Sequence, residues 1–381
     1  MQTGHIYKKV NKKGKGSWYL RYWDTIIQPD GSAKRKLVTK LLAPYPAYRS
    51  KDSVKPLAVE FLAPLNSGKL RPESTMTLAQ FVEHHFLPHV EKTNKPSTYN
   101  GYQEMWKDHL AGRCGHMRLR EFRCCDGDRL LADVVRQKDL ARSSARKLKA
   151  ILSCVFKFAK QQGVLDGINP MVDVSIPVCK PPIETHAYSL NEILSMLNVL
   201  SGRAHLVVMT AAFTGLRECE LRGLRWEEYT GAEISVSRSA WKTHVTEPKT
   251  PKSKAPVPVI SILADKLNQY RQSLGNPQSG WIFESRNGKP LNLDNLATRE
   301  IRPLLKAAGL RFYGWHAFRR GLATNLIALG VEPKTVQAIL RHSNVLTTLN
   351  LYAKSIPEQS VHAMRNLEEL FTQCSPTQAV N

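Results

Sequence analysis

The feature that most constrains the fold is a proline-rich break at Ile176–Ile183, which reads Ile-Pro-Val-Cys-Lys-Pro-Pro-Ile. Proline has no backbone N–H and keeps the residue before it extended, so neither a helix nor a central strand is expected to run through this stretch. With 381 residues, the chain is also longer than one hydrophobic core usually organises. We therefore expect separate domains, joined by a linker at residues 176–184.

The first 42 residues are predicted to form a small β-sheet domain. The stretch that begins at Trp18 alternates, which puts Trp18, Leu20 and Tyr22 on one face of a strand. Pro29–Gly31 signals a turn, and Lys34–Thr39 is the expected returning strand.

Residues 43–75 contain several prolines and little periodicity, and are predicted to be a linker. Residues 76–175 are predicted to form a helical domain, whose clearest helix runs from Ser143 or Ser144 to Gln162 and stops at Gly163. One side of this helix is basic. The other side has apolar residues at steps of three and four, which indicates a buried face: Leu148, Ile151, Leu152, Val155, Phe158 and Ala159.

The charge of the chain indicates a polyanionic partner. Lysine and arginine number 55 against 32 acidic residues, a net charge of +23, and nucleic acid is the commonest partner of such a chain. Cations are interleaved with aromatic residues in the predicted sheet and cover one side of the predicted helix. A merely solvated basic surface is the alternative for both. The candidate DNA-binding residues are Lys8, Lys9, Arg21, Lys34, Arg35, Lys36, Arg146, Lys147, Lys149 and Lys157.

Several classes of protein are disfavoured. The most apolar run, His205–Phe213, is about half the length that a bilayer span requires, and no apolar signal segment follows Met1. The seven cysteines are odd in number and scattered, which favours reduced thiols in the cytoplasm. The group around Cys114 and Cys124 matches no zinc pattern, and neither a Walker loop nor a dinucleotide fingerprint is present. We expect no metal, no cofactor and no membrane partner.

A further domain is predicted to start near Thr185 and to mix helices with a few strands. Ser189 and Glu192 form a capping box that opens a helix. Its inward residues are expected to be Ile193, Leu194, Met196, Leu197 and Leu200. The predicted strands lie at 234–237, 257–260 and 281–283.

The segment Thr214–Trp226 carries the first of four clusters with chemical potential in this domain. A buried apolar helix is predicted to end at Gly215, so Arg217 stands at the start of the next helix. A helix N-terminus and a guanidinium at one point can bind a phosphate. Glu220 lies three residues further on, on the same helix face, where it can hold Arg217 in place. Taken alone, an ordinary surface Arg–Glu pair is the alternative.

The other three clusters follow along the chain. Pro248–Lys254 is a cationic tip between two predicted strands, and His316 and Arg319 share one face of a predicted helix. His342 stands at a turn, with Tyr352 beyond it. Singly, such residues are ordinarily solvated lysines, a helix-capping histidine and a packing tyrosine.

The order of the four clusters resembles the catalytic domain of the tyrosine site-specific recombinases, the phage integrase family. The motifs are Thr-Gly-Leu-Arg-x-x-Glu-Leu-x-x-Leu, His-x-x-Arg and Leu-x-His-Ser-x-x-x-Thr-Thr…Tyr. The resemblance implies a catalytic domain at 185–360, mixed α/β but mostly helical, and a C-terminal tail at 361–381. The helical domain is similar to the family's core-site-binding domain, and the N-terminal sheet to its arm-site-binding domain. The implied fold class is multidomain, mainly α with small β parts.

The resemblance also implies an enzyme that breaks and rejoins DNA through a 3′-phosphotyrosine, without metal or ATP, to integrate or excise a mobile element. Arg217 and Arg319 would bind the non-bridging oxygens of the scissile phosphate, and His342 would donate a third hydrogen bond. Glu220 would support Arg217.

Three further roles follow from the same resemblance. Tyr352 would be the nucleophile, and His316 would accept its proton. Lys249 matches best as the acid for the leaving 5′-oxygen, with Lys252 as the second candidate.

The sequence departs from the family at Arg320, where His or Lys is common, and at Arg341, where Gly is common; Ala317 and Phe318 replace a usual Asp-Leu. The implied partners are double-stranded DNA attachment sites, three further copies of the chain in a homotetramer, a host DNA-bending factor and an excisionase. A bacterial or phage-encoded protein associated with the nucleoid is implied. A relaxing topoisomerase and a non-cleaving DNA-binding regulator are the alternatives.

Overall fold

The computed structural model describes residues 1–10, 16–28, 30–68, 71–247, 255–342, 344, 346 and 349. The chain divides into two compact units, Met1–Ile183 and Glu184–Asn381. The division falls at the end of the proline-rich stretch identified in the sequence. Each unit is described by itself.

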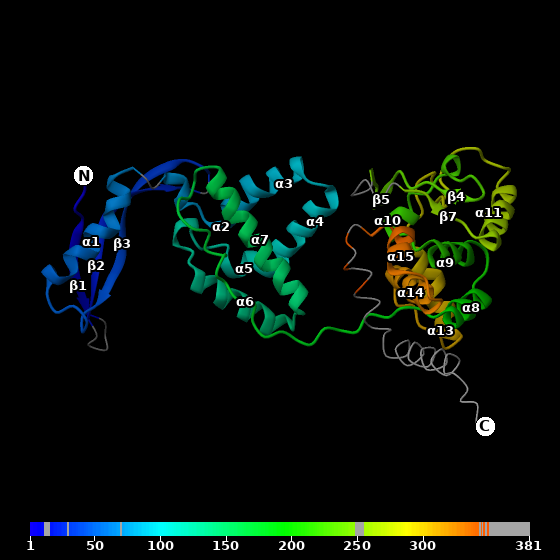
Figure 1. Ribbon diagram of the computed structural model, residues 1–381. Coiled ribbons are helices and arrows are strands. Elements are labelled where there is room, and N and C mark those ends of the chain that lie inside the picture. Colours follow the sequence, from blue (N-terminus) through cyan, green and yellow to red (C-terminus); the bar gives the residue numbers. More distant parts are fainter. Residues whose placement is uncertain are drawn as a thin grey trace, which may run out of the picture. The chain divides into compact units, whose positions relative to one another are not determined.

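The first unit begins with a three-stranded antiparallel sheet in the order β1-β2-β3. The strands are β1 (His5–Val10), β2 (Gly16–Ile27) and β3 (Ala33–Pro44). Trp18, Leu20 and Tyr22 are buried on one face of β2. The predicted alternation is therefore confirmed. Helix α1 (Lys51–Asn66) packs on this face, as Figure 1 shows.

Helix α1 corrects the prediction of a linker at residues 43–75. Val54, Ala58 and Leu62 recur at steps of four residues and are buried against the sheet. This helix is not predicted from the sequence because Pro56 and Pro64 lie inside it, and proline usually marks a break. Burial of the apolar stripe stabilises the helix in spite of them.

The rest of the first unit is a helical bundle. Its longer helices are α4 (Pro96–Met105), α6 (Cys124–Lys138) and α7 (Arg142–Gln161). The shorter ones are η1 (Pro72–Thr75), α2 (Leu78–Phe81), η2 (Val82–Phe86), α3 (Leu87–Thr93), η3 (Trp106–Leu110), α5 (Ala111–Cys114) and η4 (Leu119–Glu121). All six apolar residues predicted to face inward from α7 are buried. A buried ion pair between Asp24 of β2 and Arg120 of η4 joins the sheet to the bundle.

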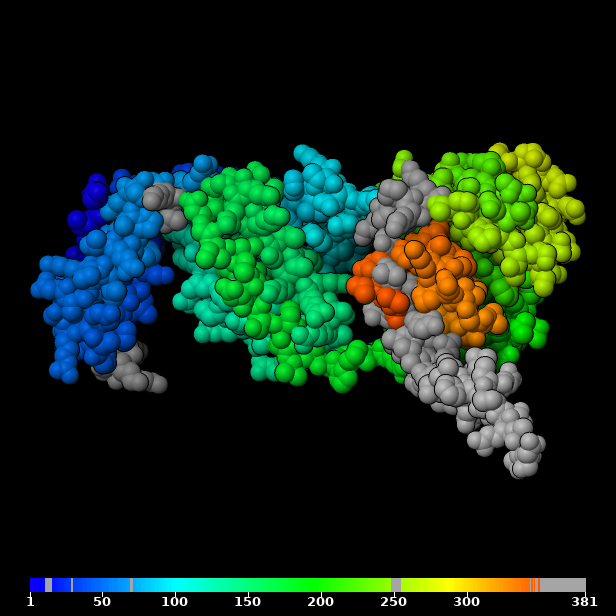
Figure 2. Space-filling model, in the orientation of Figure 1, coloured from blue at the N-terminus to red at the C-terminus, as the bar shows by residue number. Residues whose placement is uncertain are grey.

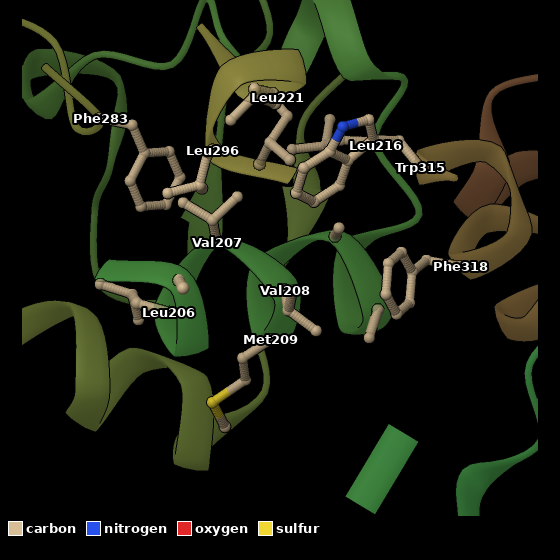
Figure 3. Packing of buried hydrophobic residues seen from close by; sticks show 14 of the residues in the cluster. Leu206, Val207, Val208, Met209, Leu216, Leu221, Phe283, Leu296, Trp315 and Phe318 are labelled. Atoms are coloured by element: carbon tan, nitrogen blue, oxygen red, sulfur yellow. The ribbon is translucent and has the colours of Figure 1, made fainter. Parts of the chain in front are cut away.

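The second unit is mostly helical and packs around α9 (Gly202–Thr214). Figure 3 shows Val207 and Val208 of α9 among the side chains of this core, together with Phe318. The other helices are α8 (Leu190–Val199), α10 (Glu218–Leu221), η5 (Trp226–Glu228), α11 (Ser261–Ser273), α12 (Leu293–Leu296), η7 (Ala297–Ile301), α13 (Arg302–Ala307), α14 (Trp315–Ala328) and α15 (Pro333–Leu340).

The capping box predicted at the start of α8 is present. The Ser189 side chain accepts a hydrogen bond from the backbone N–H of Glu192, whose carboxylate accepts one from the backbone of Ser189. Five residues were expected to face inward, and the prediction is wrong for Leu194, whose side chain is 54% exposed. It lies one position outside the apolar stripe, because an α-helix turns 100° per residue.

The strands of the second unit are shorter than predicted. β4 (Glu233–Ile234) pairs with β7 (Val257–Pro258), and between them lies a hairpin of β5 (Ser239–Trp241) and β6 (His244–Thr246). At 281–283 the structure has only an isolated bridge from Trp281 to Arg225. The predicted cationic tip, with Lys249 and Lys252, lies outside the described residues. Over the ranges that the structure describes, we find no helix that is both long and apolar enough to span a bilayer.

Candidate active site

The turn after α9 places the first part of the site. Helix α9 ends at Gly215, which has a left-handed backbone (φ 59°), a conformation that glycine adopts without a Cβ penalty. A Cβ built here would lie 2.6 Å from the Leu340 side chain and 2.9 Å from that of Leu322. Glycine therefore lets the α9–α10 turn approach α14 and the end of α15 closely.

Arg217 stands at the N-cap of α10, as predicted. Its guanidinium donates from Nη1 to Oε1 of Glu220 (2.7 Å), and its backbone N–H donates to Oε2 of the same carboxylate (3.0 Å). The Glu220 side chain is 5% exposed, whereas that of Arg217 is 35% exposed. The carboxylate therefore holds the guanidinium from the interior, and the arginine reaches toward solvent.

Arg319 comes from α14 and is buried. Its Nη1 donates to the carbonyl of Gly215 (2.6 Å), and its Nη2 donates to the carbonyl of Leu340. Burial, and then the nearby charge of Arg217, lower the pKa of Arg319 to about 9. The guanidinium is still charged at neutral pH, but an additional anion beside it would be stabilising.

Arg341 was not among the predicted site residues. It caps the C-terminal end of α15 in a left-handed conformation (φ 55°) and is buried. Its Nη2 donates to Oε2 of Glu220 at 2.8 Å. The turn before His342 therefore forms with arginine where the family often has glycine. The one feature of the sequence that singles out Arg341 is that an arginine stands where the family often has glycine.

The two histidines of the predicted set both have lowered pKa values. Burial, followed by the charges of Arg319 and Arg217, lowers the pKa of His342 to about 4. Partial burial, and then Arg319, hold the pKa of His316 below its usual range. Both imidazoles are therefore mostly neutral at neutral pH. A neutral imidazole can donate one hydrogen bond or accept one proton.

The structure thus brings four predicted catalytic residues and their supporting carboxylate together from α10, α14 and the end of α15: Arg217, Glu220, His316, Arg319 and His342. With Arg341, the described part of the site has three guanidiniums around the single carboxylate of Glu220. Such a cluster is poised to bind an anion. α14 and α15, coloured orange, reach the surface of the second unit (Figure 2). Tyr352, like Lys249 and Lys252, lies outside the described residues.

The candidate DNA-binding residues of the first unit fall into three groups. Arg146, Lys147 and Lys157 are exposed on α7. Lys149 instead donates to the backbone carbonyls of Val172 (3.1 Å) and Val174 (2.5 Å). A DNA phosphate would have to replace these two carbonyls as the acceptor for Lys149.

The sheet cations are exposed but divide between its two faces. Residues paired directly across strands share a face. Lys8, Lys34 and Lys36 pair with Trp18, Ile26 and Asp24, and so lie on the face that α1 covers in part. Lys9 pairs with Ser17 and Arg35 with Thr25, on the open face that also carries Arg21.

Comparison with known proteins shows which proteins this chain resembles. Residues 185–359 match the family model described as the phage integrase family. Over these residues, which lie in the second unit, the chain is similar to the phage integrase family. A XerC-like tyrosine recombinase from Caldanaerobacter subterraneus subsp. tengcongensis is 26% identical over 96% of this chain and 99% of its own length. An integrase from Streptomyces ambofaciens is 26% identical over 65% of this chain and 69% of its own length.

Solved structures of integrases have the same fold. A structure of the Tn1549 transposon integrase bound to transposon right-end DNA has a TM-score of 0.62 at 21% identity, and covers 77% of this chain and 100% of that one. A lambda integrase dimer bound to a core site has a TM-score of 0.58 at 17% identity, and covers 92% of this chain and 95% of that one. The predicted fold class, mainly helical with a small N-terminal sheet, is confirmed.

Proposed function

We propose that this chain is a site-specific DNA recombinase that breaks and rejoins DNA through a covalent 3′-phosphotyrosine, and so integrates or excises a mobile element. The observation that carries the proposal is a cluster of three guanidiniums: Arg217 and Arg341 pair with the carboxylate of Glu220, and Arg319 lies within reach of their charges. A pentavalent phosphate in the transition state carries about two negative charges, which oriented guanidiniums stabilise.

The phosphate would be held by residues from three elements. Arg217 reaches toward solvent from the start of α10, and Arg319 is fixed by two backbone carbonyls. We assign both to the non-bridging oxygens. His342, neutral because of its lowered pKa, would donate one further hydrogen bond.

The bond changes require a nucleophile, a base and an acid. The phenol oxygen of Tyr352 attacks phosphorus, its proton passes to His316, and the bond from phosphorus to the 5′-oxygen breaks. Lys249, or Lys252 as the second candidate, gives a proton to that oxygen. A 5′-hydroxyl of another strand reverses the step. The phosphotyrosine conserves the energy of the phosphodiester, so we expect no need for ATP, metal or cofactor.

We propose the following partners and domains. The chain acts on double-stranded attachment sites as a homotetramer, assisted by a host DNA-bending factor and an excisionase. Residues 76–175 would bind the core site and residues 1–42 the arm site, while residues 185–360 catalyse. Because the substrate is DNA, we place its action at the nucleoid. A solved lambda integrase tetramer on a Holliday junction is 18% identical, with a TM-score of 0.57, and covers 90% of this chain and 94% of that one. It supports both the DNA partner and the assembly.

Replacement of the proposed nucleophile tests the function directly. Tyr352→Phe removes the hydroxyl, so we expect no protein–DNA adduct on a denaturing gel, with unchanged DNA binding in a native gel. The probe is labelled duplex DNA amplified from the region that flanks the gene. Tyr313→Phe, at an exposed tyrosine of the same unit, is the matched control and should still form the adduct. An adduct with Tyr352→Phe would refute the assignment. Relaxation of supercoiled plasmid without paired sites would instead indicate a topoisomerase.

A further inference from the structure

The carboxylate of Glu220 lies between two guanidiniums. Its Oε1 accepts from Arg217 at 2.7 Å and its Oε2 from Arg341 at 2.8 Å. The side chains of Glu220 and Arg341 are 5% and 1% exposed, while that of Arg217 is 35% exposed. Arg341 is therefore the interior partner of the carboxylate, and Arg217 the one that faces outward.

The backbone at Arg341 is in a conformation that favours glycine. Its φ of 55° lies in the left-handed region, where a Cβ is unfavourable. Hydrogen bonds from Arg341 N–H to the carbonyl of Ala338 (3.0 Å) and from His342 N–H to that of Gln337 (3.1 Å) close the end of α15. An arginine at this position needs a compensating interaction, and the buried pair with Glu220 supplies one.

We propose that Arg341 is a positioning residue for strand cleavage: it holds Glu220 in place as an anion, and Glu220 in turn orients the Arg217 guanidinium toward the scissile phosphate. This inference rests on the function proposed above. It assigns Arg341 no contact with DNA.

The electrostatics around Glu220 give the physical reason. Burial raises the pKa of this carboxyl, but the Arg341 charge, and then the backbone N–H and guanidinium of Arg217, outweigh burial and lower it. Arg319 and His316 of α14 also face the carboxylate, and Cys219 precedes it on α10. Without Arg341, the buried carboxyl would take up a proton at a higher pH. A protonated Glu220 would hold Arg217 less firmly.

The test measures single-turnover adduct formation against pH, with duplex DNA from the region that flanks the gene as the probe. In the wild type, protonation of the base His316 should give an acid limb with a slope of one proton. Arg341→Met should add a second proton to that limb. Adduct formation should slow by about tenfold one pH unit below the pKa of Glu220 in this variant, where about nine-tenths of the carboxyl is protonated. In Arg341→Met/Glu220→Gln residue 220 no longer titrates, so the slope should return to one.

Arg341→Gly separates positioning from backbone conformation. Glycine suits the left-handed turn, so a residue that serves only the turn would be replaced without harm. We expect this variant to stay folded and still to show the two-proton limb. Arg222→Met is the matched control, because Arg222 is a buried arginine of the same unit that donates to the carbonyls of Leu291 and Lys242. It should lower the unfolding temperature and leave the slope at one.

A slope of one in folded Arg341→Met and Arg341→Gly would overturn the inference. If the wild type forms no adduct, the proposed function fails instead. The interaction of Arg341 with Glu220 is then tested by unfolding temperatures measured against pH. The stability gap between wild type and Arg341→Met should narrow as the pH falls, because a protonated Glu220 does not need the cation. In the Glu220→Gln background the gap should not vary with pH. A gap that is independent of pH in both backgrounds would refute the role of Arg341.

Discussion

The cations of the N-terminal sheet and those of the second unit differ in what holds them. On the sheet, Arg21 and Arg35 are exposed and lie over aromatic rings. Their Cζ atoms are 5.2 Å from the ring centre of Tyr7 and 5.3 Å from that of Trp23, respectively. In the second unit, Arg319 is fixed by backbone carbonyls from two separate turns, and Arg341 by a buried carboxylate.

This difference separates two uses of positive charge. Exposed cations on a sheet contribute to affinity roughly in proportion to their number and are screened by salt. Guanidiniums fixed in advance cost no reorganisation when charge develops on a phosphate, so each has a large effect on rate. We therefore expect substitutions in the two regions to affect different measurements.

The largest effect is expected from Arg319→Ala. Loss of one oriented donor commonly lowers the rate by on the order of 10²–10³, and Arg319 is held more firmly than Arg217. Adduct formation should fall by at least that factor, with little change in DNA affinity in a native gel. Arg319→Lys should not restore the rate, because an ammonium lacks the planar fork that spans two acceptors. A fall in affinity that matched the fall in rate would make Arg319 an ordinary binding residue.

An intermediate effect is expected on stability at acid pH. The pKa of His342 lies at about 4 in the folded protein, below its ordinary value of 6.5, so the unfolded chain binds the proton more readily. The contribution of neutral His342 is complete above about pH 6.5 and is lost as the pH falls toward about 4. By pH 5 the loss should reach up to about 2 kcal/mol.

Denaturant unfolding at pH 7 and pH 5 measures this loss. His342→Gln cannot titrate, so its stability should fall less between the two pH values than that of the wild type. Equal losses in both proteins would mean that His342 is protonated without cost in the folded state, and would remove the reason to regard it as a neutral donor.

The sequence was sufficient wherever the relevant contacts are local. The spacing of Arg217 and Glu220 predicted their pairing, since residues three apart on a helix lie side by side. The stripe of α7 was predicted because it repeats over about three turns, from Leu148 to Ala159. Arg341 could not be found in this way, because its partner Glu220 is 121 residues away and only the packing of α15 against the α9–α10 turn brings them together.

Two other failures have the same origin. Helix α1 forms in spite of two prolines because its apolar stripe is covered by the sheet, and that tertiary contact is not visible in a local pattern. Likewise, the sequence pattern alone does not separate the cations of the sheet into two sets. Their division between an open face and the face of α1 depends on register, and one residue of shift would exchange the two sets.

The smallest effect is expected from the sheet, and it tests whether the open face binds DNA. Lys9, Arg21 and Arg35 lie on that face, and their combined substitution by glutamine should lower affinity by roughly tenfold. The dependence of log affinity on log salt should become shallower by about 0.9 for each phosphate that the protein no longer neutralises. The matched control replaces Lys8, Lys34 and Lys36, which lie on the face of α1.

In the control set, Lys8 stacks over Tyr45 and Lys36 donates to Gln28, so the control substitution removes equal charge but fewer interactions with phosphates. Titrations of duplex DNA at several salt concentrations compare the two triple variants. If both reduced the slope equally, the sheet would attract DNA only through its total charge. The contrast with the active site would then be sharper, because geometry would matter in one region of this chain and not in the other.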